Sequence, residues 1–246
     1  MADYQLERQS AIDAHGIIGD MRSAALVNDK GSVDFFCWPE FDSPSIFCSL
    51  LDTPEAGIFQ LAPDLPGARR EQIYLPDTNV LQTRWLSDRA VVEVTDLLPI
   101  GDSEDDLPVL MRRVRVVSGQ VTIHMRCAVR HDYARAKTRA RMDDRHVTFA
   151  AANQPSLRLS SDQVLRIEDN AAIAEFTLEQ GQSAEFLLGG IDDPRFKEGG
   201  ATLCLERTLK YWRDWSGQSS YRGRWREMVN RSALALKLLT SRKHGA

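Results

Sequence analysis

Residues 19–51 read GDMRSAALVNDKGSVDFFCWPEFDSPSIFCSLL. The first half predicts an apolar strand over Ala24–Val27, a turn at Asn28–Gly31 and a second strand over Ser32–Trp38. Asn, Asp and Gly tolerate the positive φ angles of tight turns, so these two strands are expected to form a β-hairpin.

The second half of this stretch predicts a stiff, partly buried loop between Pro39 and Pro44, because proline restricts the backbone. The apolar run Ser45–Leu51 then predicts a short helix. Ser43 is the expected N-cap of this helix and Pro44 its first residue, as the preferences of those positions indicate.

The same loop holds the best candidates for binding. Trp38 lies close to Glu40, Asp42 and Ser43. An aromatic ring can cover the apolar face of a pyranose while carboxylates accept hydrogen bonds from its hydroxyl groups. The structural alternative, in which Asp42 and Ser43 serve only as a helix cap, remains open from the sequence.

Beyond the opening stretch, short apolar segments recur at intervals of about ten residues and several alternate with period two, as half-buried strands do. Ser118-Gly119 between two of them predicts a hairpin turn. So many strands indicate two packed sheets. The predicted strands are Gly57–Ala62, Gln72–Leu75, Asn79–Leu86, Ala90–Leu97, Val109–Val117, Val121–Val129, His146–Ala151, Leu157–Ser160, Val164–Ile167, Ala171–Leu178 and Ser183–Leu188.

The pattern becomes helical near residue 198. One helical face is formed by Cys204, Thr208, Tyr211, Trp212 and Trp215, and Ser216-Gly217 ends that helix. A second helix is predicted over residues 221–242, with Gly245 as a left-handed cap. Its leucines point around most of the circumference, so we expect a further domain or a partner chain to cover it.

Composition limits the class of protein. The 246 residues are 43% hydrophobic and 27% charged, with a formal net charge of -4. The charge argues against nucleic acid or an anionic membrane as partner, and no apolar run is long enough for a membrane span. The polar, acidic N-terminus is unlike a signal peptide, so a cytoplasmic location is expected. The four cysteines fit no zinc pattern and are expected as buried thiols, with no metal or cofactor.

The remaining charged groups have mainly structural interpretations. An acidic cluster is expected to be a solvated loop, and His15 is expected to have a structural role. Residues 135–141 alternate basic and small side chains, which predicts a strand with one basic face. The acidic cluster consists of Asp102, Glu104, Asp105 and Asp106.

Three stretches resemble the N-terminal domain of glycoside hydrolase family 15, which comprises bacterial and archaeal glucoamylase, glucodextranase and trehalase-like proteins. The stretches are Ile12–Leu51, Val109–Tyr133 and Thr208–Gly245. The resemblance implies an antiparallel super-β-sandwich followed by two C-terminal helices. It divides the chain into a sandwich at 1–197, a linker helix at 198–217 and a truncated start of an (α/α)6 catalytic barrel at 218–246.

The resemblance also implies a function. Family members hydrolyse α-glucosidic bonds with inversion, and their catalytic glutamates lie in the barrel, so no catalytic residue is expected in this chain. It would support and frame the barrel, with α-glucan or trehalose at the interface between them. Rim or interface residues would be Trp38, Glu40, Phe41, Asp42 and Ser43, and the barrel-facing helix would present Trp225, Leu234, Leu236, Leu238 and Leu239.

Two other functions are carried as alternatives. In the first alternative, the chain is a stand-alone carbohydrate-binding or interaction module. In the second, it is a mutarotase-like enzyme that modifies sugars. The second alternative needs a histidine and a carboxylate in one cleft, and its candidates are His124, His131 and Glu93.

Overall fold

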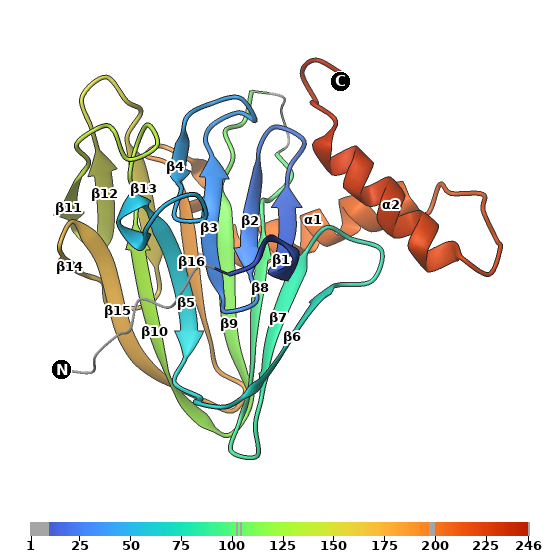
Figure 1. Ribbon diagram of the computed structural model, residues 1–246, viewed down its shortest axis with the longest axis horizontal. Coiled ribbons are helices and arrows are strands. Elements are labelled where there is room, and N and C mark those ends of the chain that lie inside the picture. The colour runs from blue at the N-terminus through green and yellow to red at the C-terminus, as the bar shows by residue number, and fades with distance from the viewer. Residues whose placement is uncertain (1–9, 102, 104, 197–199, 246) are drawn as a thin grey trace.

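Two antiparallel sheets packed face to face form most of the computed structural model, which describes residues 10–101, 103, 105–196 and 200–245 (Figure 1). Within these residues the first sheet has eight strands in the order β1-β2-β3-β5-β10-β15-β14, with β4 paired to β3. Its members are β1 (His15–Gly19), β2 (Ala24–Asn28), β3 (Ser32–Cys37), β4 (Ser45–Phe47), β5 (Ile58–Pro63), β10 (Gln120–Ala128), β14 (Arg166–Glu168) and β15 (Ala171–Glu179).

The second sheet also has eight strands within the described residues, in the order β11-β12-β13-β16-β9-β8-β7-β6. They are β6 (Arg69–Tyr74), β7 (Leu81–Leu86), β8 (Val91–Leu97), β9 (Leu110–Ser118), β11 (Arg139–Asp143), β12 (His146–Ala150), β13 (Leu157–Ser161) and β16 (Ser183–Gly190). The predicted two-sheet architecture is confirmed, as are the β2–β3 hairpin and each predicted strand after residue 57, with ends shifted by a few residues.

The main core lies between the sheets and follows from the period-two pattern of the strands. In β9, Leu110, Val114 and Val116 belong to this core, whereas Met111 points to the opposite face and packs in a second cluster. All four cysteines are buried, as expected, and none of them forms a disulfide within the part of the chain that the structure describes.

Arg112 is a charged residue of β9 whose side chain points into the core and contacts both sheets. It is fully buried together with Asp96 of β8, and its Nε lies 2.7 Å from Asp96 Oδ1. Its Nη2 donates to the carbonyl of Gly31, 2.9 Å away, and its Nη1 donates to the carbonyl of Phe59. The guanidinium therefore satisfies backbone acceptors of the first sheet while paired within the second.

Helix α1 (Gly200–Ser216) covers the outer face of the second sheet. Its buried face, with Cys204, Thr208 and Trp212, matches the predicted face, and Ala201 and Cys204 pack against Leu97 and other outward side chains of the strands. Burial on this face explains why a helix of otherwise polar residues lies flat on the sandwich.

Helix α2 (Arg226–Leu239) lies beside β1 at the edge of the sandwich (Figure 1). Leu234 and Leu238 are buried in a third cluster with Met21 and Trp212. Asn79, in the β6–β7 turn, donates to the carbonyl of Leu234 at 3.0 Å. One face of α2 is thus fixed to the sandwich and to α1.

The helix predicted over Ser45–Leu51 is wrong. Residues 45–47 form strand β4, which pairs with β3 through Phe36↔Phe47 and Cys37↔Ser45. Phe47 stacks between Phe36 and Phe59, at ring-centroid distances of 6.4 and 6.3 Å. Residues 45–47 adopt a strand and not the predicted helix, because pairing with the backbone of β3 and packing on its aromatic side chains stabilise the extended conformation. Ser43 is consequently not a helix N-cap.

The hairpin predicted at Ser118-Gly119 is also wrong, although the turn exists. Gly119 has φ +82°, but β9 and β10 belong to different sheets. A Cβ on Gly119 would lie 2.3 Å from the carbonyl oxygen of Arg89. The glycine therefore allows the chain to cross closely over the β7–β8 turn from one sheet to the other.

The basic strand predicted over residues 135–141 begins only at Arg139. Asp132, Tyr133 and Ala134 have φ values of 56°, 53° and 62°, and this left-handed backbone places Arg135 in a turn. Helix α2 is shorter than the predicted 221–242, because Thr240 is extended and the chain turns back toward Met21. Gly245 is left-handed, with φ +71°, but it follows this turn and does not cap the helix.

Candidate functional site

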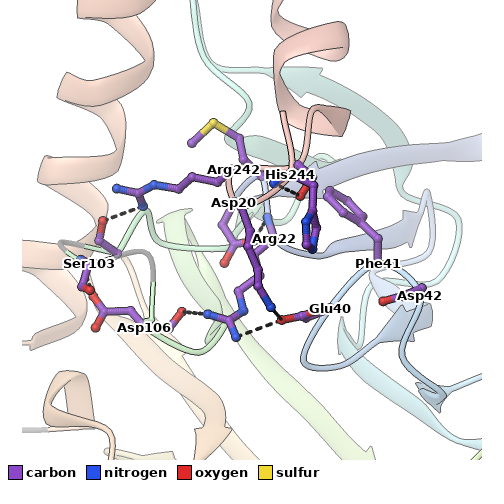
Figure 2. A pocket seen from close by; sticks show the side chains of 13 residues that line it. Asp20, Arg22, Glu40, Phe41, Asp42, Ser103, Asp106, Arg242 and His244 are labelled. Atoms are coloured by element: carbon purple, nitrogen blue, oxygen red, sulfur yellow. Dashed lines mark hydrogen bonds and ion pairs between the residues drawn. The ribbon is translucent and has the colours of Figure 1, made fainter. Parts of the chain in front are cut away.

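A pocket of about 210 Å³ opens at the end of the sandwich where the β1–β2 turn, the β3–β4 loop and the β8–β9 loop meet the chain that follows α2 (Figure 2). It is lined by residues 20–22, residues 40–42, Gly101, Ser103, Asp106 and residues 241–244. Four segments that are far apart in the sequence therefore build one site.

The β1–β2 turn supplies a strained and buried wall. Met21 has φ +68°, a conformation that costs a residue with a Cβ on the order of 1 kcal/mol or more. Its buried side chain in the third cluster and the backbone of Ser23 hold the turn in place. The Asp20 carboxylate accepts the amide hydrogens of Arg22 (3.0 Å) and Ser23 (2.9 Å). Burial raises the pKa of Asp20 despite these hydrogen bonds.

Arg22 connects the lining segments electrostatically. Its Nη2 lies 3.2 Å from Glu40 Oε1, and its Nη1 donates to the carbonyl of Asp106 at 3.3 Å. Lys243 Nζ lies 3.7 Å from the same Glu40 oxygen. The Arg22 guanidinium thus joins the β3–β4 loop to the β8–β9 loop (Figure 2), and the segment after α2 reaches the same Glu40 carboxylate through Lys243.

The segment after α2 closes the remaining side. The Arg242 amide donates to the carbonyl of Met21 at 2.8 Å, and its Nη1 donates to the carbonyl of Gly101 at 3.0 Å. The Asp106 carboxylate accepts the amide hydrogen of Ser103 at 3.0 Å. Most polar groups of the pocket therefore already have partners, and the site is preorganised.

This arrangement suits a small polar ligand with several hydroxyl groups. The ring of Phe41 offers an apolar surface, and the carboxylates of Asp42 and Asp106 with the imidazole of His244 surround the opening (Figure 2). Acidic and basic side chains are balanced, so no strong charge on the ligand is required.

The structure gathers part of the predicted rim set. Glu40, Phe41 and Asp42 line the pocket, while the hydroxyl of Ser43 accepts the amide hydrogen of Glu40 at 3.0 Å and shapes the loop. Trp38 is only 4% exposed, and its indole N–H donates to the carbonyl of Pro108 at 2.9 Å. Its ring belongs to the core cluster and not to the pocket.

Sequence reasoning missed the other lining groups. Asp20 and Arg22 lie in the stretch 19–51, and an acidic and a basic residue just before the strand at 24–27 were the sequence signal that could have indicated this site. Asp106 was interpreted as part of a solvated loop, and Arg242 only as the end of the predicted second helix; the fold brings the two residues together. Asp102 and Glu104 of the predicted acidic cluster lie outside the described residues.

The predicted barrel-facing set divides into two groups. Leu234 and Leu238 are buried against the sandwich and α1. Trp225, Leu236 and Leu239 are exposed on the other side of α2. The leucines therefore point to different sides of α2, and this chain itself covers the side that carries Leu234 and Leu238.

The groups proposed for a mutarotase-like enzyme each have another partner. Glu93 Oε1 accepts from Arg84 Nε at 2.9 Å, and His124 lies 3.6 Å from Glu175. His131 is buried between the hydroxyl of Thr138 and the carbonyl of Pro155, both 3.0 Å away.

His15 holds Asp34 at 2.8 Å and the Ala11 carbonyl, a structural role. The described part of the chain gathers no cluster of three His, Cys, Asp or Glu side chains suited to a metal ion, and none of its helices is long and apolar enough to span a membrane.

Comparison with known proteins assigns the fold to a family. The model of the family described as trehalase-like, N-terminal matches residues 5–186. This chain belongs to the trehalase-like N-terminal family. The match covers the strands of the two sheets as far as the first half of β16 and the pocket segments at 20–22, 40–42 and 101–106, whereas residues 241–244 lie beyond it.

Three curated relatives of this trehalase-like N-terminal domain are named trehalases. The protein of Thermoplasma volcanium is 32% identical over 243 residues, which cover 97% of this chain and 39% of the relative. Those of Mycolicibacterium smegmatis and Mycobacterium tuberculosis are 31% and 30% identical, each over 94% of this chain and 38% of the relative. The chain therefore spans less than two fifths of the length of these relatives.

Proposed function

We propose that this chain is the non-catalytic N-terminal domain of an inverting glycoside hydrolase of family 15 that acts on trehalose or a related α-glucoside. One observation carries the proposal: the chain aligns over 94–97% of its own length with trehalases, yet spans only 38–39% of theirs. A cytoplasmic location is part of the proposal, and four buried cysteines without a disulfide among the described residues support it.

The proposed division follows the sequence: a sandwich at 1–197, a linker helix at 198–217 and the first part of an (α/α)6 catalytic barrel at 218–246. The burial of α1 along the second sheet supports its assignment to the sandwich side. The bare face of α2, with Leu236 and Leu239, supports its assignment to a unit continued elsewhere. Residues 198–199 at the proposed boundary lie outside the described residues.

Chemistry supports a framing role for the pocket. Inversion requires a carboxylic acid and a carboxylate roughly 6.5–9.5 Å apart with a water between one of them and the sugar. Glu40 is held by Arg22 and Lys243, and Asp20 by two backbone amides, so both carboxylates serve the structure of the pocket. In the proposal the barrel supplies acid and base, while Glu40, Phe41 and Asp42 form the rim that meets the sugar.

The test is glucose release by the purified 246-residue chain from trehalose, maltose, isomaltose and dextrin. We expect none above background, with the Thermoplasma volcanium trehalase as the positive control in the same assay. Sustained turnover of any of these sugars by the chain would show that it contains its own acid and base, and would overturn the non-catalytic assignment.

Carbohydrate binding by the chain alone is a second candidate, favoured by the ring of Phe41 beside the carboxylate of Asp42 at the pocket opening. Calorimetric titration with trehalose and maltotriose tests it. The Phe41→Ala variant is expected to weaken binding, whereas Tyr133→Ala, an exposed aromatic outside the pocket, is the matched control. Absence of heat with both sugars would leave only the framing role.

A further inference from the structure

A second pocket lies where α1 ends beside α2, the two helices being joined by residues 217–225 (Figure 1). This α1–α2 pocket has a volume of about 270 Å³ and shares no lining residue with the pocket at the end of the sandwich. Pockets for drug-sized ligands measure about 300–1,000 Å³, so this smaller one suits a group of the size of one sugar ring. It is lined by Trp215, Ser216, Gln218, Ser219, Asn230 and Ala233.

The β6–β7 turn holds the polar groups of the α1–α2 pocket in place. Asp77, which has a left-handed backbone with φ +60°, accepts two hydrogen bonds on the same oxygen, Oδ1. One comes from the hydroxyl of Ser216 at 3.3 Å and the other from the amide nitrogen of Asn230 at 3.0 Å. In the same turn, Asn79 donates to the carbonyl of Leu234 at 3.0 Å. One turn therefore fastens both helices, so a ligand does not have to order the pocket.

Backbone hydrogen bonds fix the side of the pocket that follows α1. The amide of Gln218 donates to the carbonyl of Trp215 at 3.2 Å, and the amide of Ser219 donates to the carbonyl of Ser216 at 3.1 Å. Arg222 Nη1 donates to the carbonyl of Ser219 at 2.6 Å. These bonds continue the turn at the end of the helix, and they keep the backbone of Gln218 and Ser219 close to that of Trp215.

The lining groups combine an aromatic ring with neutral hydrogen-bonding groups. Trp215 packs partly against the third cluster, and the rest of its side chain lines the pocket. Ser216 and Asn230 are only 5% and 6% exposed, so the pocket reaches buried hydroxyl and carboxamide groups. An indole ring can cover the apolar face of a pyranose, and hydroxyl and amide groups both donate to and accept from the hydroxyl groups of a sugar.

The charge of the α1–α2 pocket favours a neutral ligand. None of the described residues that line it has a charged side chain. Helix α1 ends at Ser216, and the C-terminal end of a helix carries a partial negative charge, which disfavours carboxylates and phosphates. A neutral ligand that is rich in hydroxyl groups therefore fits the pocket better than an anion.

We infer that the α1–α2 pocket binds one neutral sugar ring, which stacks on the indole of Trp215 and forms hydrogen bonds with Ser216, Gln218 and Asn230. It is an accessory binding site with no part in cleavage, because no carboxyl group of the described residues lines it. The site is separate from the one that contains Phe41, and the choice of an α-glucoside as its ligand rests on the proposed function.

Fluorine NMR of the chain labelled with fluorotryptophan tests the inference, since each of the five tryptophans gives its own signal. The variant Trp215→Phe identifies the signal of Trp215. Titration with methyl α-glucoside is expected to shift this signal until it saturates. The signal of Trp225, which is exposed in the same region but outside the pocket, should stay in place. Absence of a saturable shift at Trp215 would overturn the inference.

Calorimetric titration with methyl α-glucoside in the Phe41→Ala background measures the affinity of the α1–α2 pocket without the other pocket. Loss of ring stacking in Trp215→Ala should weaken the affinity about tenfold. Gln218→Ala changes an exposed side chain that a fold does not depend on, and loss of its hydrogen bond should weaken the affinity about threefold. Trp225→Ala is the matched control and should leave the affinity unchanged. Unchanged affinity in Trp215→Ala or in Gln218→Ala would overturn the inference.

Two other probes decide between kinds of ligand. A shift of the Trp215 signal with tetramethylammonium and none with methyl α-glucoside would assign the pocket to a cation and reject the inference. An equal shift with glycerol at the same concentration of hydroxyl groups would show that any polyol suffices, with the same consequence. Glucose release by the chain would reject the proposed function while leaving sugar binding at Trp215 as a separate result.

Discussion

The interior between the two sheets and the end of the sandwich that carries the pocket and α2 are built from the same residue types, but they differ in closure. In the interior, Arg112 and Asp96 are fully buried and every neighbour belongs to the chain. At the end, the Arg22 and Glu40 side chains keep 20% and 31% of their surface exposed, and Leu236 is bare. This chain alone closes the interior, whereas the pocket end keeps ionic and apolar side chains exposed.

Loss of Arg112 is expected to have the largest effect on stability. The Arg112→Leu variant leaves the Asp96 carboxylate buried without its cation and two carbonyls of the first sheet without a donor. Removing one partner of a buried ion pair costs about 3–5 kcal/mol. Urea denaturation, followed by circular dichroism, measures the change in the free energy of unfolding.

The control for this prediction is the double variant Arg112→Leu/Asp96→Leu. It removes both charges and should recover a large part of the lost stability, because apolar replacement of a buried pair is often close to neutral. A single variant as stable as the wild type would mean that the interior is open to water, and would remove the contrast with the pocket end.

The two sides of α2 provide the second prediction. Leu238 is fully buried in the cluster with Met21 and Trp212, so Leu238→Ala should cost about 2–5 kcal/mol. Leu236 lies on the exposed side of the same helix, so the unfolding free energy of Leu236→Ala should stay within about 0.5 kcal/mol of the wild-type value. Equal losses in thermal unfolding of the two variants would contradict the placement of α2.

Particular residues show what the sequence could and could not predict. The Asn28–Gly31 hairpin and the period-two strands are local signals, and they were correct because each strand has one face toward a core. Residues Ser45–Phe47 form a strand because they pair with β3. Ser118-Gly119 forms no hairpin because the chain crosses there from one sheet to the other. Both conformations depend on long-range contacts, which a local sequence pattern does not contain. Sequence alone could not place Arg22 and Arg242 in one pocket, because their meeting needs the whole fold.

Titration of His131 gives a third, smaller effect. Burial lowers the pKa of this imidazole below its ordinary value of 6.5, so the unfolded chain binds a proton more readily than the folded one. Stability from the neutral ring is therefore complete above pH 6.5 and is lost as the pH falls toward the folded-state pKa. The His131→Gln variant lacks this loss. The difference in unfolding free energy between the two proteins should change from pH 7.5 to pH 5.0 in favour of the variant, and a difference independent of pH would show that the ring is solvated.

The smallest change in unfolding free energy is expected for a substitution in the pocket, because its ionic groups are partly exposed to water. Glu40 pairs with Arg22 and Lys243 at the surface, where an ion pair contributes about 0.2–1 kcal/mol and is weakened by salt. Glu40→Gln should therefore lower the unfolding free energy by less than about 1 kcal/mol, and 1 M NaCl should reduce the difference. Asp214→Asn, which removes the exposed pair with Lys210 on α1, is the matched control for a surface ion pair away from the pocket. A loss of unfolding free energy as large as that of Arg112→Leu would show that Glu40 behaves like a residue of the buried interior. The pocket would then have a purely structural role, and the proposal that Glu40 contacts a sugar would be rejected.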